Sequence, residues 1–146
     1  MFELSATRLD VKRYRDAVEH HSCGALMVFE GTVRNNFDGR PVRALEYQAY
    51  PELALPVMEQ ITAELHRSHP KARVAIAHRT GTLALGEVSM VIAVATPHRA
   101  GCYEASRFLI EALKERLPVW KKEIFTDGDA HWKANDPDAS PGPGSA

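Results

Sequence analysis

The chain has 146 residues, of which 45% are hydrophobic and 25% charged, and its formal net charge at pH 7 is −1. This composition predicts one globular domain with a sizeable core, and the balanced charge gives no bulk field for nucleic acid or membrane. The first ten residues lack the apolar segment of a signal peptide, and no stretch reaches transmembrane length. Two cysteines are too few for a disulfide framework. We therefore expect a cytoplasmic protein that binds neither nucleic acid nor membrane.

Hydrophobic periodicity divides the chain into strands and helices. Apolar–polar alternation is typical of a strand, and apolar residues three or four positions apart are typical of an amphipathic helix. Asp10 can cap the first helix, and Pro51 suits the first turn of the second. The patterns predict strands at residues 2–4, 25–34, 42–50, 74–78, 88–96 and 119–125, helices at 11–18 and 51–68, and a third helix that follows residues 97–101 and ends at Leu117. Residues 35–39 and 81–86 are expected to be a turn and a loop.

The order β-α-β-β-α-β-β-α-β predicts an α+β fold with three helices and a mixed, largely antiparallel sheet. Apolar spacing predicts the buried face of the second helix at Leu53, Val57, Ile61 and Leu65, and that of the third at Ala105, Phe108, Leu109, Ala112, Leu113 and Leu117. Residues 1–136 are predicted to form a single α+β domain. Residues 137–146 are rich in Pro, Gly and Ser and are predicted to be a disordered tail.

The segment from Lys114 to Lys122 is the most informative part of the sequence. Pro118 lacks an N–H and biases the preceding residue away from helical geometry, so the third helix should end there. Lys114 then lies in the last helical turn, and Lys121 follows just beyond the break, after Trp120. Two lysines at such a position can bind an anion or supply an amine. The alternative is a cationic helix end that only complements the helix dipole.

Two further basic segments lie where strands end or helices begin. Arg34 closes an apolar strand, and a guanidinium there can hold a phosphate or carboxylate bidentately, although a solvated edge residue is the alternative. His98 and Arg99 precede the third helix, whose unpaired N–H groups attract anions. The alternative for this pair is a surface turn with incidental charge.

Other candidate residues carry weaker signals. His66 and His69 are spaced to share a metal ion, but no third ligand and no HExxH motif is apparent, so a solvated helix end is favoured. Cys102 lies at a helix start, which lowers the pKa of a thiol, but one cysteine four residues after a histidine is a weak nucleophile signal. We expect no metal and no cofactor.

Five strings, taken together and in order, resemble one known family. They are residues 29–35 (FEGTVRN), 45–50 (LEYQAY), 78–81 (HRTG), 97–99 (PHR) and 114–122 (KERLPVWKK). The sequence from about Leu4 to Asp136 is similar to the large, catalytic subunit of molybdopterin synthase. The resemblance implies an α/β hammerhead-like fold and the sulfur-transfer step of molybdenum cofactor synthesis.

In that family a small ubiquitin-like subunit carries a C-terminal glycine thiocarboxylate, whose sulfur passes to cyclic pyranopterin monophosphate and builds the dithiolene of molybdopterin. The resemblance implies a homodimer of the large subunit within a heterotetramer. It places the two active-site lysines at Lys114 and Lys121 and a substrate-binding arginine at Arg34. It also implies that His98 and Arg99 reach the pocket from the other protomer, and it places pocket-lining residues at Phe29 and Ile110.

Two alternatives to a sulfurtransferase remain. One is a noncatalytic α+β module that senses a phosphorylated ligand through its basic residues. The other is an adaptor that only docks a ubiquitin-like protein. A sensor has no need of a lysine with a perturbed pKa, so the lysine pair discriminates best between these hypotheses.

Overall fold

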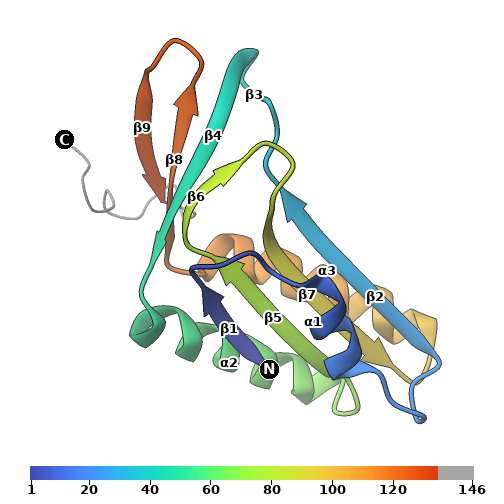
Figure 1. The fold of residues 1–146 in the computed structure, drawn as a ribbon. Helices are drawn as coiled ribbons and strands as arrows, with labels where there is room; N and C mark the ends of the chain where they lie inside the picture. Colours follow the sequence, from blue (N-terminus) through green and yellow to red (C-terminus); the bar gives the residue numbers. More distant parts are fainter. Residues whose placement is uncertain (135–146) are drawn as a thin grey trace.

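A computed structural model describes residues 1–134 of the chain, so the predicted tail at 137–146 lies outside the described residues. The elements in chain order are β1 (Phe2–Ser5), α1 (Val11–Val18), β2 (Ala25–Thr32), β3 (Asn36–Phe37), β4 (Arg40–Ala49), α2 (Pro51–Ser68), β5 (Arg73–Arg79), β6 (Gly81–Ala84), β7 (Val88–Thr96), α3 (Arg99–Arg116), β8 (Val119–Phe125) and β9 (Ala130–Ala134) (Figure 1). Within this part of the chain, no helix combines the length and apolar character needed to cross a lipid bilayer.

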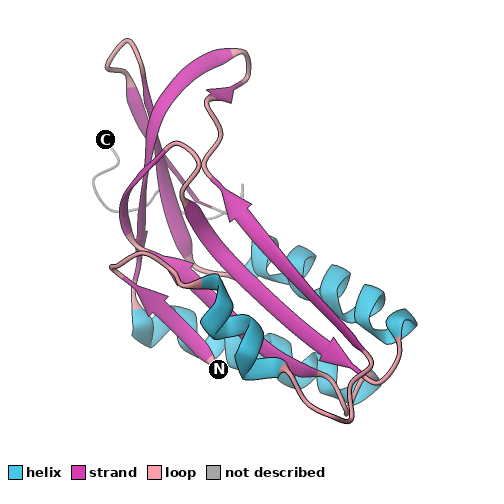
Figure 2. Cartoon of the chain, turned by 45° about the vertical axis from the view of Figure 1, so that its right-hand side comes forward, coloured by secondary structure: helices cyan, strands magenta, loops and turns pink. Residues whose placement is uncertain are grey.

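The strands form two sheets. The first has the order β1-β5-β7-β2, with β1 and β5 parallel and the other pairs antiparallel. The second has the order β3-β4-β8-β9, with β6 paired to β4, and all of its pairs are antiparallel. Helices α2 and α3 cover one face of the first sheet and α1 covers the other, while β4, β8 and β9 extend away from the helices as an arm (Figure 2). The expected α+β fold with three helices and largely antiparallel strands is confirmed.

The core has two layers, one on each face of the first sheet. The larger layer packs α2 and α3 against the sheet through fully buried side chains that include Met58, Ile61, Ile76, Ile92, Leu109 and Leu113. The smaller layer packs Tyr14 and Val18 of α1 against a sheet face built mainly from alanine and valine. The predicted cap of α1 is confirmed, because the Asp10 carboxylate accepts a hydrogen bond of 3.2 Å from the Lys12 N–H.

Two predicted helix faces were partly wrong. Leu53 is 49% exposed, and Ala54 and Met58 occupy the buried face of α2 together with Ile61 and Leu65. The reason is geometric: a four-residue step advances about 400°, so a stripe spaced by fours drifts about 40° per step away from the core. In α3, Phe108 lies off the buried stripe and is 37% exposed.

Three short strands lie outside the predicted set. Residues 81–86, expected to be a loop, contain β6, whose Leu83 is fully buried and pairs with Leu45. The expected turn at 35–39 is a hairpin in which Asp38 and Gly39 both adopt positive φ, as a two-residue type I′ turn requires, and its flanks form β3 and the start of β4. β9 has no counterpart in the prediction, and β2 ends at Thr32, so that Arg34 lies in the loop beyond the strand.

Candidate active site

Three basic side chains from three distant segments line one cavity of about 240 Å³. Arg34 comes from the loop after β2, Lys114 from the last turn of α3, and Lys121 from β8. We call this space the lysine cavity. Its other lining residues are Gly31, Thr32, Asn36, Phe37, Val42, Leu45, Tyr47, Ser89 and Glu123. The structure therefore brings together three of the residues that the sequence singled out.

The break between α3 and β8 directs the two lysines to the same place. Helix α3 ends at Arg116, and the Leu117 N–H donates the last helical bond to the Leu113 carbonyl before the backbone becomes extended. The break before Pro118 was therefore predicted correctly. The two basic residues of this last turn have different roles. Arg116 pairs with Glu64 on α2, whereas Lys114 lines the cavity, as expected of a residue that binds an anion.

The two lysines have different electrostatic surroundings. Partial burial, and then the nearby charge of Lys121, lower the pKa of Lys114 below the usual lysine value, although the residue lies at the exposed rim. Among residues 1–134, no carboxylate oxygen lies within 4 Å of its amine. The Lys121 ammonium, in contrast, lies 3.7 Å from the carboxylate of Glu123. Loss of a proton is therefore easier for Lys114 than for a lysine in water.

Glu123 is a buried acid at the wall of the cavity. It is 3% exposed, and its second oxygen lies 2.9 Å from the ammonium of Lys133 on β9. Two cations therefore compensate its charge, as a buried carboxylate requires. Sequence reasoning missed Glu123, although the two-residue period of a strand places it on the same face as Lys121.

Lys122 lies on the opposite face of β8. Its ammonium is 2.9 Å from the Glu46 carboxylate and 4.9 Å from the centre of the Trp132 ring. Adjacent residues of a strand point to opposite faces, and this separates Lys122 from the cavity that Lys121 lines.

Backbone hydrogen bonds on both sides of Arg34 fix the loop that carries it. The Val33 N–H donates to the Glu87 carbonyl, and the Asn35 carbonyl accepts from the Val42 N–H. Arg34 itself is exposed, so its guanidinium remains accessible to a ligand in the cavity. This accessibility suits a residue that binds an anion.

The other predicted site residues do not line the lysine cavity of this chain. His98 directly precedes α3 and makes no capping hydrogen bond with its side chain. Arg99 begins the helix, about 22 Å along the helix axis from Lys114 by the rise of 1.5 Å per residue. Phe29 and Ile110 are half-buried and pack against the larger core layer. Phe29 still lies beside the cavity, because its ring edge approaches Gly31.

The weaker candidates have structural contacts. His66 Nε2 lies 2.8 Å from the Ala72 carbonyl, and His69 Nε2 lies 2.8 Å from Glu104. The prediction of a lowered thiol pKa for Cys102 is wrong, because burial raises that pKa and the thiol donates to the Val94 carbonyl. In the described part of the chain, no three His, Cys, Asp or Glu side chains gather as metal ligands do.

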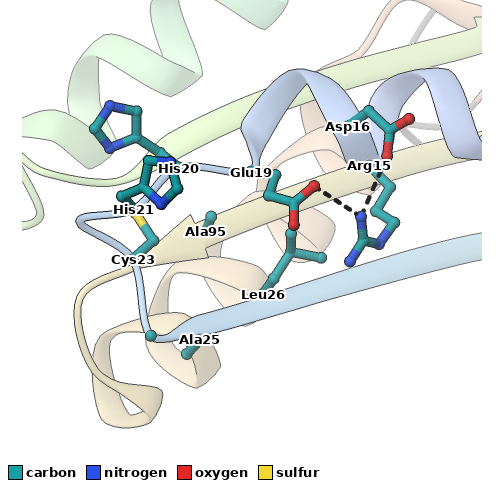
Figure 3. A pocket seen from close by; sticks show the side chains of 10 residues that line it. Arg15, Asp16, Glu19, His20, His21, Cys23, Ala25, Leu26 and Ala95 are labelled. Carbon is teal, nitrogen blue, oxygen red and sulfur yellow. Dashed lines mark hydrogen bonds and ion pairs between the residues drawn. The ribbon is translucent and has the colours of Figure 1, made fainter.

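A larger cavity, of about 470 Å³, lies between the end of α1 and the start of β2 (Figure 3). Arg15 at its wall pairs with Asp16 and Glu19 on its own helix, and the Nδ1 atom of His20 lies 2.7 Å from the Ser22 hydroxyl. Its charged groups are thus largely engaged with one another, and none of the basic residues that the sequence singled out lines it. Cavity volume alone therefore does not identify the candidate active site.

Comparisons with known proteins identify the family of this chain. The family model described as MoaE protein matches residues 4–116. The chain belongs to the MoaE protein family. Molybdopterin synthase catalytic subunit 1 from Aedes aegypti is 46% identical over 136 residues, which cover 91% of this chain and 88% of that protein. The resemblance found in the sequence is thereby confirmed.

Solved structures extend the MoaE match to the whole fold. A crystal structure of molybdopterin synthase from Staphylococcus aureus has a TM-score of 0.86 and 36% identity, and the match covers 90% of this chain and 96% of that one. A complex of subunits 1 and 2 of molybdopterin-converting factor from Helicobacter pylori matches with a TM-score of 0.69, covering 97% of this chain and 93% of that one. Its identity of 21% shows a shared fold. The MoaE match at residues 4–116 includes Arg34 and Lys114, whereas Lys121 lies beyond it.

Proposed function

We propose that this chain is the catalytic subunit of a molybdopterin synthase. In this proposal it transfers sulfur from the C-terminal glycine thiocarboxylate of a small ubiquitin-like subunit to cyclic pyranopterin monophosphate, and two transfers form the dithiolene. One observation carries the proposal: Arg34, Lys114 and Lys121, which are far apart in sequence, line one cavity, and the pKa of Lys114 is lowered there. Membership of the MoaE family supports it.

The chemistry of the lysine cavity suits both reactants. The thiocarboxylate and the phosphate of the substrate are anions, and preorganised cations stabilise such charges most strongly where water is partly excluded. An amine with a lowered pKa can also act as a nucleophile or exchange a proton near neutral pH. A module that only senses an anion needs charge alone, so the lowered pKa of Lys114 favours catalysis over sensing.

The proposal includes a homodimer in which the partner's His98 and the partner's Arg99 complete each cavity, with one small subunit bound at each end of the resulting heterotetramer. β2 is an edge strand of the first sheet, and its Met27 is 40% exposed. One end of β2 pairs with Thr96, just before His98, and Gly31 and Thr32 at its other end line the lysine cavity. Antiparallel pairing of two β2 edges about a twofold axis would therefore carry the start of α3 of one protomer toward the cavity of the other.

The cellular setting that we propose is the cytoplasm. Cys23 and Cys102 are both free thiols, as is usual where the compartment is reducing.

Reconstitution tests the function directly. The purified chain is mixed with a thiocarboxylated small subunit and cyclic pyranopterin monophosphate, and dithiolene formation is followed. Small subunit that ends in an ordinary carboxylate is the matched control, because it supplies the same tail without sulfur. We expect dithiolene only with the thiocarboxylate. If the folded chain binds the small subunit and yet forms no dithiolene, it is an adaptor and the proposal is wrong.

A further inference from the structure

We propose that Tyr47 is a further binding residue of the lysine cavity, whose hydroxyl donates a hydrogen bond to the anion that the cavity takes up. The anion is either the carboxylate-type terminus of the small subunit or the phosphate of the substrate, since both offer acceptor atoms to an O–H group. The inference rests on the proposed function and adds a residue to that site.

The pairing of β4 with β8 places Tyr47 directly opposite Lys121. Residues that face each other across an antiparallel pair have Cβ atoms about 4.5–5.5 Å apart and project from the same face of the sheet. Both side chains line the lysine cavity, as does Glu123 two residues further along β8. An anion that contacts Lys121 in the cavity is therefore within reach of Tyr47.

A buried histidine holds the ring of Tyr47 in place. The His78 and Tyr47 rings meet edge to face, with centroids 4.9 Å apart and an interplanar angle of 73°. His78 is 3% exposed, and its Nδ1 lies 2.7 Å from the Arg79 carbonyl. A carbonyl can only accept, so Nδ1 carries the proton, and burial lowers the pKa of His78 to about 4 and keeps the ring neutral at pH 7. Tyr47 thus packs on a support of fixed orientation and no charge.

The hydroxyl of Tyr47 is a permanent donor at neutral pH. Burial, and to a smaller extent the negative charge of Glu123, raise the pKa of Tyr47, while the neighbouring Ser89 hydroxyl opposes part of that rise. Ser89 donates its own proton to the Gly31 carbonyl at 3.1 Å, so toward Tyr47 its oxygen can only accept. Rotation about the C–O bond then lets the tyrosine donate to an anion instead. Unlike Lys114, whose amine loses its proton more readily, Tyr47 keeps this ability throughout the neutral range.

Tyr47→Phe is the sharpest test, because it removes one oxygen and keeps the ring against His78. A hydrogen bond to an anion is about twice as strong as one to a neutral acceptor such as water or a hydroxyl. Tyr47→Phe removes this difference, so we expect it to weaken anion binding about tenfold. Calorimetry with the thiocarboxylated small subunit measures binding of the tail, and the KM for cyclic pyranopterin monophosphate measures binding of the phosphate. Tyr103→Phe is the control, because Tyr103 is 59% exposed on α3.

We expect the tenfold loss in one of the two measurements for Tyr47→Phe and in neither for Tyr103→Phe; the affected measurement identifies the anion. Tyr47→His keeps a ring with an N–H donor and should recover part of the loss. Unchanged tail affinity together with unchanged KM in Tyr47→Phe would overturn the proposal. So would equal losses in Tyr47→Phe and Tyr47→His, with lowered unfolding midpoints in both, since the role would then be structural. Wild-type turnover tests the proposed function separately, and the calorimetric measurement needs no turnover.

Discussion

Replacing Lys121 with alanine should separate catalysis from stability. Loss of one preorganised charged group at a reacting centre typically lowers the rate by about 10²–10³, which corresponds to about 2.7–4 kcal/mol of transition-state stabilisation. The cost to the fold should be much smaller. Glu123 loses only its more distant partner, at 3.7 Å, and keeps Lys133 at 2.9 Å. Because the Lys121 side chain is 34% exposed, we expect a stability loss of at most about 1 kcal/mol.

Lys122→Ala is the matched control, since it removes the same side chain from the adjacent position. Lys122 contacts the Glu46 carboxylate and the Trp132 ring on the other face of the sheet. These contacts contribute up to about 1 kcal/mol each, so this variant should lose at least as much stability as Lys121→Ala. Its turnover should change little, because its charge does not line the cavity.

The assay is single-turnover dithiolene formation with saturating thiocarboxylated small subunit, together with urea unfolding of each variant. We expect a large rate loss with a small stability loss for Lys121→Ala, and almost no rate loss with an equal or larger stability loss for Lys122→Ala. Equal rate losses at the two positions would refute the reasoning, because bulk charge would then matter and placement would not. Unchanged turnover in folded Lys121→Ala would remove Lys121 from the site.

Three more predictions follow from the electrostatics and the proposed dimer. The acetylation rate of Lys114, measured by mass spectrometry over a pH series, should rise at lower pH than that of an ordinary lysine, and Lys121→Ala should move this rise to higher pH. Superimposable curves for the two proteins would show that Lys121 does not lower the pKa of Lys114. His78 is buried and neutral, so in this pH range only the unfolded chain binds a proton at this residue. The free energy of unfolding should therefore fall by about 3 kcal/mol as the pH drops from about 6.5 to about 4. In urea titrations, His78→Phe should remove this share of the pH dependence. Arg99→Ala and Lys121→Ala chains, each inactive alone, should regain activity when mixed under subunit exchange, because a mixed dimer has one intact cavity; exchange proven by mass spectrometry without recovered activity would contradict the shared cavity.

Local chemistry made most of the fold predictable. Pro118 lacks an N–H and biases Leu117 away from helical geometry, so α3 ends before it, and the Asp10 carboxylate caps the Lys12 N–H of its own helix. The strands that escaped prediction depend on partners far away in sequence. β6 lies between Gly81 and Gly86, both at positive φ, so the segment resembles a loop until Leu83 is paired with β4. β9 is a short strand whose partner among residues 1–134 is β8.

In the candidate site, too, local sequence features could be predicted and features that depend on strand pairing could not. Lys114, Lys121 and Arg34 were predictable, because a basic residue beside a helix break or a strand exit is conspicuous in the sequence. Glu123 and Tyr47 were not, since an acid and an aromatic residue in a strand are unremarkable until the pairing of β4 with β8 places them beside Lys121. Sequence reasoning therefore found the cations of the cavity and missed the groups that surround them.

The surroundings of the two lysines favour a division of roles in the proposed reaction. The Lys121 ammonium lies near the Glu123 carboxylate, which Lys133 holds from the other side. This ion-pair network suits Lys121 to the role of a stationary positive charge. Lys114 has no carboxylate within 4 Å among residues 1–134, and its pKa is lowered by partial burial and by the neighbouring cation. An amine that must attack a carbonyl or exchange a proton needs to become neutral, whereas a group that holds a phosphate or a thiocarboxylate needs to stay charged. One cavity with two lysines in unlike environments can meet both needs, which neither a uniform basic patch nor a single lysine can do.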